Sequence, residues 1–191
     1  MKRICFVHLL VCLLAWCFCG AKAAGASDDV SQESLYAILS YKFLRYAQWP
    51  EEMVADEGEL VIGVYGNSSA GRRYREAFSD LCRGLGESAG ARCRVVDLSD
   101  PSVDTRQLKL VFFAEESRRV PQELMDQLRS QPVVLVGYDD AFLDRGGMIR
   151  LKTKRSQGSF DVDLDNVRAV GLDFKSSFLR LADQVRIGGK R

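Results

Sequence analysis

The apolar residues of the chain fall into short continuous runs separated by stretches with helical spacing. The runs occupy residues 60–65, 93–98, 108–114 and 133–137. They are predicted strands; the first is rich in β-branched residues, and the last, at 133–137, is typical of a strand that is buried on both faces. Helical spacing follows the first run over 72–85 and precedes the last run over 121–129. This order predicts parallel strands joined by helical crossovers.

A helix is expected before the first strand. Between residues 31 and 48 the apolar residues recur at three- and four-residue steps, which places them on one helical face; they are Leu35, Ile38, Leu39, Phe43 and Tyr46. Pro50 is expected to end this helix, because its ring disfavours helical backbone at the preceding residue, Trp49.

After the double glycine at 146–147, apolar and polar residues alternate strictly in two segments, 148–153 and 159–164. This pattern predicts an antiparallel hairpin. With a turn at 155–158, Lys154 faces Ser159, and the further pairs are Leu151 with Val162, Lys152 with Asp161, and Arg150 with Asp163. The inner face is then apolar and consists of Ile149, Leu151, Phe160, Val162 and Leu164. Opposite charges pair on the outer face.

The last predicted element is a helix capped by Ser176 or Ser177, with an inward stripe of Phe178, Leu181, Ala182 and Val185. The expected fold class is therefore α/β. It is a single domain over 24–191, with a mixed, mostly parallel central sheet flanked by helices, a C-terminal antiparallel hairpin and a terminal helix. Its 168 residues suit one hydrophobic core.

Residues 1–23 form a predicted signal peptide. Lys2 and Arg3 precede an apolar run over 4–19, and small residues follow it. We expect cleavage after Ala23, with a site after Ala26 as the alternative. An uncleaved membrane anchor is the competing interpretation, because the run approaches the length that spans a bilayer.

Export changes the composition that matters for function. Loss of Lys2, Arg3 and Lys22 lowers the 27 basic residues to 24, against 26 acidic ones, so the mature chain is near neutral. This argues against nucleic-acid binding, which needs concentrated positive charge. The single histidine, His8, leaves with the signal peptide, which excludes histidine-dependent nucleophiles and the usual zinc sites. We expect a non-catalytic protein without a cofactor or a metal.

Two of the six cysteines remain after cleavage, Cys82 and Cys93. A lone pair in an exported chain is more often bridged than free. Closing a loop of this length would stabilise the fold by about 3 kcal/mol. Two separate buried thiols are the alternative.

One loop has the outline of a phosphate-binding loop between a strand and a helix; its residues are Gly66, Asn67, Ser68, Ser69 and Gly71. Arg72 and Arg73 replace the lysine and the hydroxyl residue that nucleotide hydrolysis needs. The loop is therefore expected to be a plain tight turn or an anion-binding loop.

Two acidic segments also admit a chemical interpretation. Residues 161–166 imitate the start of a calcium loop, but Leu172 stands where its glutamate is needed. Pairing with the opposite strand explains these aspartates without a metal. Asp139, Asp140 and Asp144 follow a strand in a turn-like stretch, where aspartate is common, so we do not assign them as catalytic carboxylates.

Several short motifs stand in a fixed order along the mature chain. They are Tyr-x-x-Trp-Pro at 46–50, Pro-Val-Val-Leu-Val at 132–136, Gly-Gly-Met-Ile at 146–149, Phe-Asp-Val-Asp at 160–163 and Ser-Phe-Leu-Arg-Leu-Ala at 177–182. In their order and spacing the chain resembles the YfiR family of periplasmic proteins. It departs from the usual family pattern at Asp163, where the family has asparagine.

The resemblance implies a non-catalytic regulator in the periplasm. In this family, such a protein binds the periplasmic region of an inner-membrane GGDEF diguanylate cyclase and represses it. An outer-membrane lipoprotein can draw the repressor away, which raises cyclic di-GMP and biofilm formation. Self-association as a homodimer is a further expectation.

We expect the partner-binding face to combine an aromatic anchor with exposed charges, from Tyr46, Trp49, Pro50, Arg150, Lys152, Asp161 and Asp163. The alternative from another class is a periplasmic sensor. It would bind a small molecule or an anion at 66–71, beside the carboxyl ends of the parallel strands.

Overall fold

The computed structural model describes residues 30–51, 59–89, 92–154 and 157–189. The predicted signal peptide lies outside these residues. The segment from Ser31 to the C-terminal end forms one compact unit, and the fold below is the fold of that unit.

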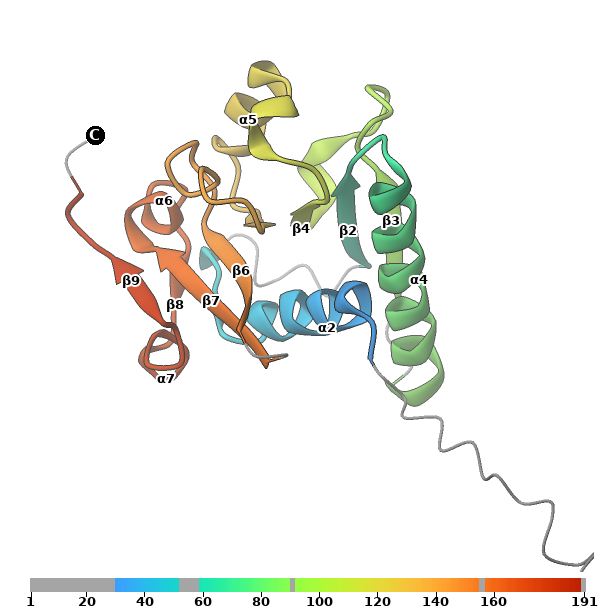
Figure 1. Cartoon of the computed structure of the whole chain (residues 1–191), viewed down its shortest axis with the longest axis horizontal. Coiled ribbons are helices and arrows are strands. Elements are labelled where there is room, and N and C mark those ends of the chain that lie inside the picture. Colours follow the sequence, from blue (N-terminus) through green and yellow to red (C-terminus); the bar gives the residue numbers. More distant parts are fainter. Residues whose placement is uncertain (1–29, 52–58, 90–91, 155–156, 190–191) are drawn as a thin grey trace, which may run out of the picture. The chain divides into compact units, whose positions relative to one another are not determined.

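Within the described residues, seven strands form one sheet in the order β3-β2-β4-β5-β6-β7-β9 (Figure 1). Their bounds are β2 (Leu60–Tyr65), β3 (Cys93–Asp97), β4 (Leu108–Phe113), β5 (Val134–Gly137), β6 (Ile149–Lys154), β7 (Gln157–Asp163) and β9 (Gln184–Arg186). Among the strand pairs of this sheet, only β6–β7 is antiparallel. The prediction of a single α/β domain with a mixed, mostly parallel sheet is confirmed.

The helices are α2 (Gln32–Leu44), α4 (Ser69–Ala89), α5 (Gln122–Leu128), α6 (Leu164–Arg168) and α7 (Ser176–Leu179). α2 begins where Ser31 accepts a hydrogen bond from the Ser34 amide. It ends before the predicted boundary at 48, because the next residues form β1 (Ala47–Gln48) and pair with β8 (Asp173–Phe174). Its buried side also differs, since Ile38 is exposed while Tyr36 is buried.

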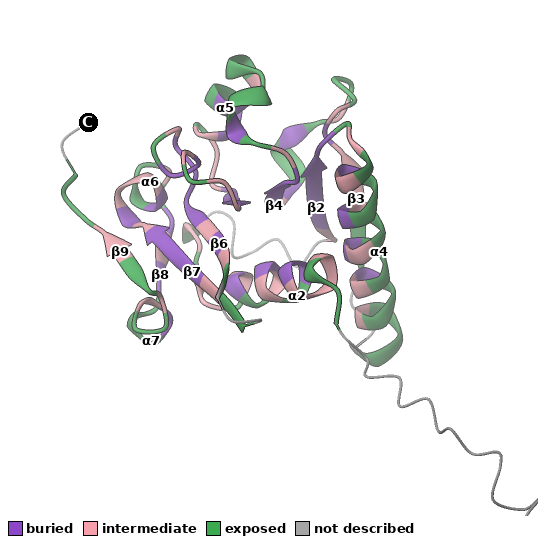
Figure 2. Ribbon diagram, in the orientation of Figure 1, coloured by how far each residue is buried: buried purple, intermediate pink, exposed green. Residues whose placement is uncertain are grey.

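Aromatic side chains fill the core between the sheet and helices α2 and α4. The ring of Phe112 on β4 lies 6.5 Å from Tyr36, 4.5 Å from Tyr74 and 5.4 Å from Phe78. Figure 2 shows β2 and β4 buried along most of their length. This half of the sheet is a conventional hydrophobic core.

The hairpin forms, but the predicted register is wrong. Arg150 faces Asp161, Leu151 faces Phe160 and Lys154 faces Gln157, so only residues 155–156 separate the strands. The ladder extends through Gly158, and a Cβ there would lie 2.6 Å from Leu39 Cδ1, so a larger residue at this position would require the Leu39 side chain to move. The slip is two positions, and because side chains alternate with a period of two, the predicted inner face is unchanged.

The predicted C-terminal helix is mostly wrong. α7 covers only four residues, and the chain then turns into β9, which pairs with β7. Phe178 is buried as expected, but Leu181 is 63% exposed. The apolar residues from Phe178 to Val185 have helical spacing. Val185 nevertheless lies in a strand, because it pairs with Val162 of β7.

Cys82 of α4 and Cys93 of β3 form a disulfide, with 5.1 Å between their Cα atoms. The bridged interpretation is confirmed over two separate thiols. The bond fixes the first residue of the edge strand β3 to the helix that precedes it in the sequence.

Candidate functional site

Four charged side chains surround a buried carboxylate on the outer face of the hairpin. Asp161 has only 1% of its side chain exposed. Its Oδ2 accepts hydrogen bonds from Nε and Nη2 of Arg150, and its Oδ1 accepts one from Lys152 Nζ at 2.6 Å. We call Asp140, Arg150, Lys152, Asp161 and Asp183 the hairpin ion cluster.

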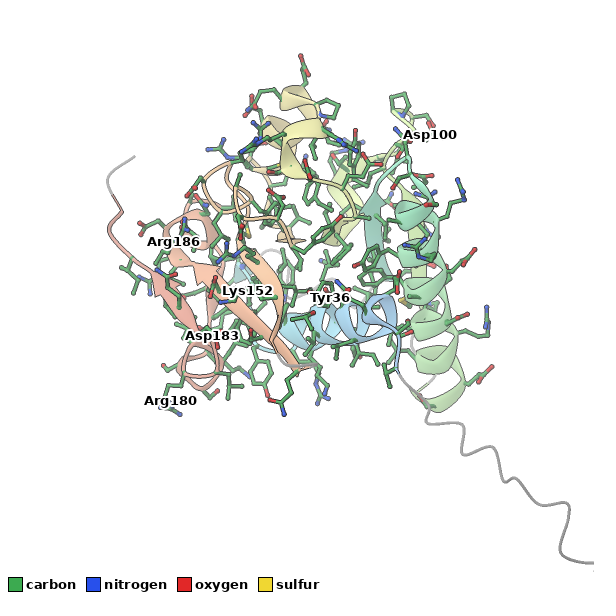
Figure 3. All side chains as sticks on the ribbon, viewed as in Figure 1. Tyr36, Asp100, Lys152, Arg180, Asp183 and Arg186 are labelled. Carbon is green, nitrogen blue, oxygen red and sulfur yellow. A yellow bond between two sulfur atoms is a disulfide. The ribbon has the colours of Figure 1, made fainter. Side chains whose placement is uncertain are left out.

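The two cations of the cluster connect Asp161 to the surface. Arg150 Nη1 donates to Asp140 at 2.7 Å, and Lys152 Nζ lies 3.1 Å from an Asp183 oxygen. Lys152 and Asp183 are labelled in Figure 3, in the region of β6 and β7. Asp140 is fully exposed, so the cluster reaches from the protein interior to solvent.

The pKa of Lys152 reflects this position. Partial burial acts to lower the pKa, but the hydrogen bonds that the ammonium group donates to Asp161 and Asp183 outweigh burial and leave the pKa above its usual 10.5. Lys152 is therefore charged at neutral pH.

Asp163 does not belong to the cluster. It caps α6 by accepting a hydrogen bond from the Asn166 amide at 3.0 Å. The predicted pair of Arg150 with Asp163 is replaced by Arg150 with Asp161, as the two-residue slip requires.

The aromatic residues of the partner-binding prediction lie elsewhere. Tyr46 stacks on Phe178 with 5.4 Å between ring centroids, and Lys109 Nζ lies 5.6 Å from the centre of the Trp49 ring. Trp49 and Pro50 are half-buried, and the Lys175 amide donates to the Tyr46 carbonyl. We call residues 46–50 the exit segment. Its strand β1 pairs with β8.

The exit segment and the ion cluster are on opposite faces of β7. Phe160 packs against Phe43 and Phe178 with centroid distances of 5.0 and 4.9 Å, so it points to the side where Tyr46 lies. Its neighbour Asp161 points the other way, because successive side chains of a strand alternate. The structure therefore separates Tyr46, Trp49 and Pro50 from the patch of Arg150, Lys152 and Asp161. It places Asp163 in neither patch.

The candidate anion loop is occupied from within the protein. The amides of Asn67 and Ser68 both donate to Oε1 of Glu115, at 2.7 and 2.8 Å. Ser69 begins α4, and Gly71 must be glycine because a Cβ there would lie 2.2 Å from the Gly66 carbonyl oxygen. An external anion would have to displace the Glu115 carboxylate, so anion binding remains a prediction that this contact disfavours.

Sequence reasoning did not find Asp183 or Glu115, and it left Asp140 in a turn. Asp183 was assigned to a helix that does not extend so far. Glu115 had one usable signal: it stands two residues after the end of β4, and the carboxyl ends of parallel strands meet at one edge of the sheet. That edge also carries the loop after β2.

Across residues 30–189, leaving aside the undescribed gaps, no group of three Cys, His, Asp or Glu side chains could hold a metal ion. No helix in the described part of the chain combines the length and the apolarity needed to cross a bilayer. The carboxylates of the calcium-like segment have other contacts, since Asp161 binds two cations and Asp163 caps a helix.

The sequence profile of the YfiR/HmsC-like family matches residues 33–183 of the chain. The chain belongs to this family. The match runs from α2 to the segment before β9, and it confirms the resemblance drawn from the motifs. Among curated proteins, none matches the chain.

Proposed function

We propose that this protein is a non-catalytic periplasmic regulator that binds the periplasmic region of an inner-membrane GGDEF diguanylate cyclase and holds the cyclase inactive. The observation that carries this proposal is the family match over residues 33–183. The Cys82–Cys93 disulfide supports an oxidising compartment.

Repression of this kind requires only differential binding. If the protein binds the inactive conformation of the cyclase better than the active one by about 3 kcal/mol, the population shifts more than a hundredfold. An outer-membrane lipoprotein that competes for the protein would relieve the repression. Neither step needs a catalytic side chain.

The first experiment is capture of the partner. The mature protein carrying an affinity tag is incubated with detergent-solubilised inner membranes of the source cells, and bound proteins are identified by mass spectrometry. We expect a GGDEF-containing membrane protein, and we expect deletion of the gene for the regulator to raise cellular cyclic di-GMP. Absence of any GGDEF protein together with unchanged cyclic di-GMP would contradict the proposal.

Two variants then test the two patches separately. Asp140→Lys reverses an exposed charge of the ion cluster, and Trp49→Leu removes the indole while keeping an apolar side chain. Arg150 is a poor choice for charge reversal, because a glutamate there would meet the buried Asp161. Arg83→Glu, on the exposed face of α4, is the control. The patch that binds the cyclase is the one whose variant stays folded but loses capture.

A further inference from the structure

The C-terminal strand β9 occupies the edge of the sheet next to β7. It pairs with β7 through three positions, Asp161 with Gln184, Val162 with Val185 and Asp163 with Arg186. β3, at the opposite edge, pairs with β2 through five positions and is joined to α4 by the disulfide. The two edge strands are therefore attached very differently.

Apolar packing contributes little to holding β9 in place. Val185 is half-buried, while Leu181 before the strand and Ile187 after it are 63% and 64% exposed. Figure 2 shows no buried residue in β9. By contrast, Phe178 just upstream is buried and contacts four other aromatic rings, so the chain is firmly packed up to that residue.

Ion pairs hold β9 at both ends. Lys152 binds Asp183 at 3.1 Å just before the strand, and Arg186 Nη1 lies 2.6 Å from Asp144 Oδ1 at its end. Beyond the strand, the Gly189 amide donates to Asp165 at 3.1 Å. These groups are partly exposed, and salt screens interactions between exposed charges.

We propose that β9 is an electrostatic strap: the segment after Phe178 detaches from β7 as a unit while the rest of the sheet stays folded. Ionic strength controls this opening, because two partly exposed ion pairs add to the few apolar contacts that Ala182 and Val185 make with the core. Opening frees the edge of β7 beside Asp161.

Hydrogen exchange of the mature protein, followed by mass spectrometry, tests the strap. Between about 0.02 M and about 0.5 M NaCl we expect exchange of the β9 amides to accelerate about tenfold. Amides of β5 in the core and of the disulfide-anchored β3 should not change. Equal protection of β9 at both salt concentrations, or an equal loss in β5, would overturn the proposal, since β9 would then open only with the whole fold.

A variant separates the strap from a general salt effect. Arg186→Gln removes the pair with Asp144 and should speed β9 exchange severalfold at low salt while making it less sensitive to added salt. Arg83→Gln, which breaks an exposed pair with Asp80 on α4, is the matched control and should leave β9 unchanged. If Arg186→Gln exchanges like the unaltered protein, ion pairing does not hold the strand.

Discussion

The two halves of the seven-stranded sheet are stabilised by different forces. β2, β4 and β5 are parallel strands whose side chains are almost all buried on both faces. β6 and β7 present one apolar face to α2 and one charged face with Asp161 at its centre. The difference shows that a strand with strict alternation can hold a buried charge if its neighbours supply the opposite charges.

The largest expected effect is in the parallel half. Phe112→Ala removes a fully buried ring that contacts Tyr36, Tyr74 and Phe78, and should lower the free energy of unfolding by about 3–5 kcal/mol. Urea denaturation measures it. Ile38→Ala is the control, because Ile38 is exposed, and it should cost far less. Similar losses for both variants would mean that β4 is not the core of the fold.

The next effect is in the charged half. Asp161→Ala leaves Arg150 and Lys152 without their buried partner and should cost about 3 kcal/mol. Asp183→Asn removes only the half-exposed partner of Lys152 and should cost less than about 1 kcal/mol. Equal effects in urea denaturation would show that burial of Asp161 is unimportant and that the two halves do not differ as described.

The smallest effect concerns alkaline pH. Since the folded pKa of Lys152 lies above 10.5, its stabilising contribution is complete below that pH and is lost as pH rises through the folded value. Lys152→Arg keeps a positive charge throughout this range. We expect the urea midpoint of the unaltered protein to fall relative to Lys152→Arg above pH 10.5. If the difference between the two urea midpoints stays constant across this pH range, deprotonation of Lys152 does not affect stability.

The same contrast explains what could be predicted from the sequence. The boundaries of β2 and β5 follow from continuous apolar runs, which need no knowledge of the partner strand. The inner face of the hairpin was also predictable, because a slip of two residues does not exchange the faces. The ion pairs could not be predicted, because shortening the turn from four residues to two changes the partner of Arg150 from Asp163 to Asp161.

The C-terminal segment and the loop after β2 depend on tertiary contacts. The spacing of Phe178, Leu181 and Val185 favours a helix, but β7 offers an open edge with which Val185 pairs instead. The Glu115 contact joins residues 47 and 48 positions apart in the sequence, so no local pattern could indicate it.

That contact changes what the fold has available for ligands. β3 lies on one side of β2, and β4 and the later strands lie on the other, so the boundary between β2 and β4 is a topological switch point. Proteins with this topology commonly bind their ligands at such a point. Here a tethered carboxylate already saturates the two amides, at an effective concentration that a dissolved anion does not reach. The two amides that would meet a ligand at this point of the fold are already hydrogen-bonded within the chain, so a ligand that binds here must displace Glu115 or contact other groups.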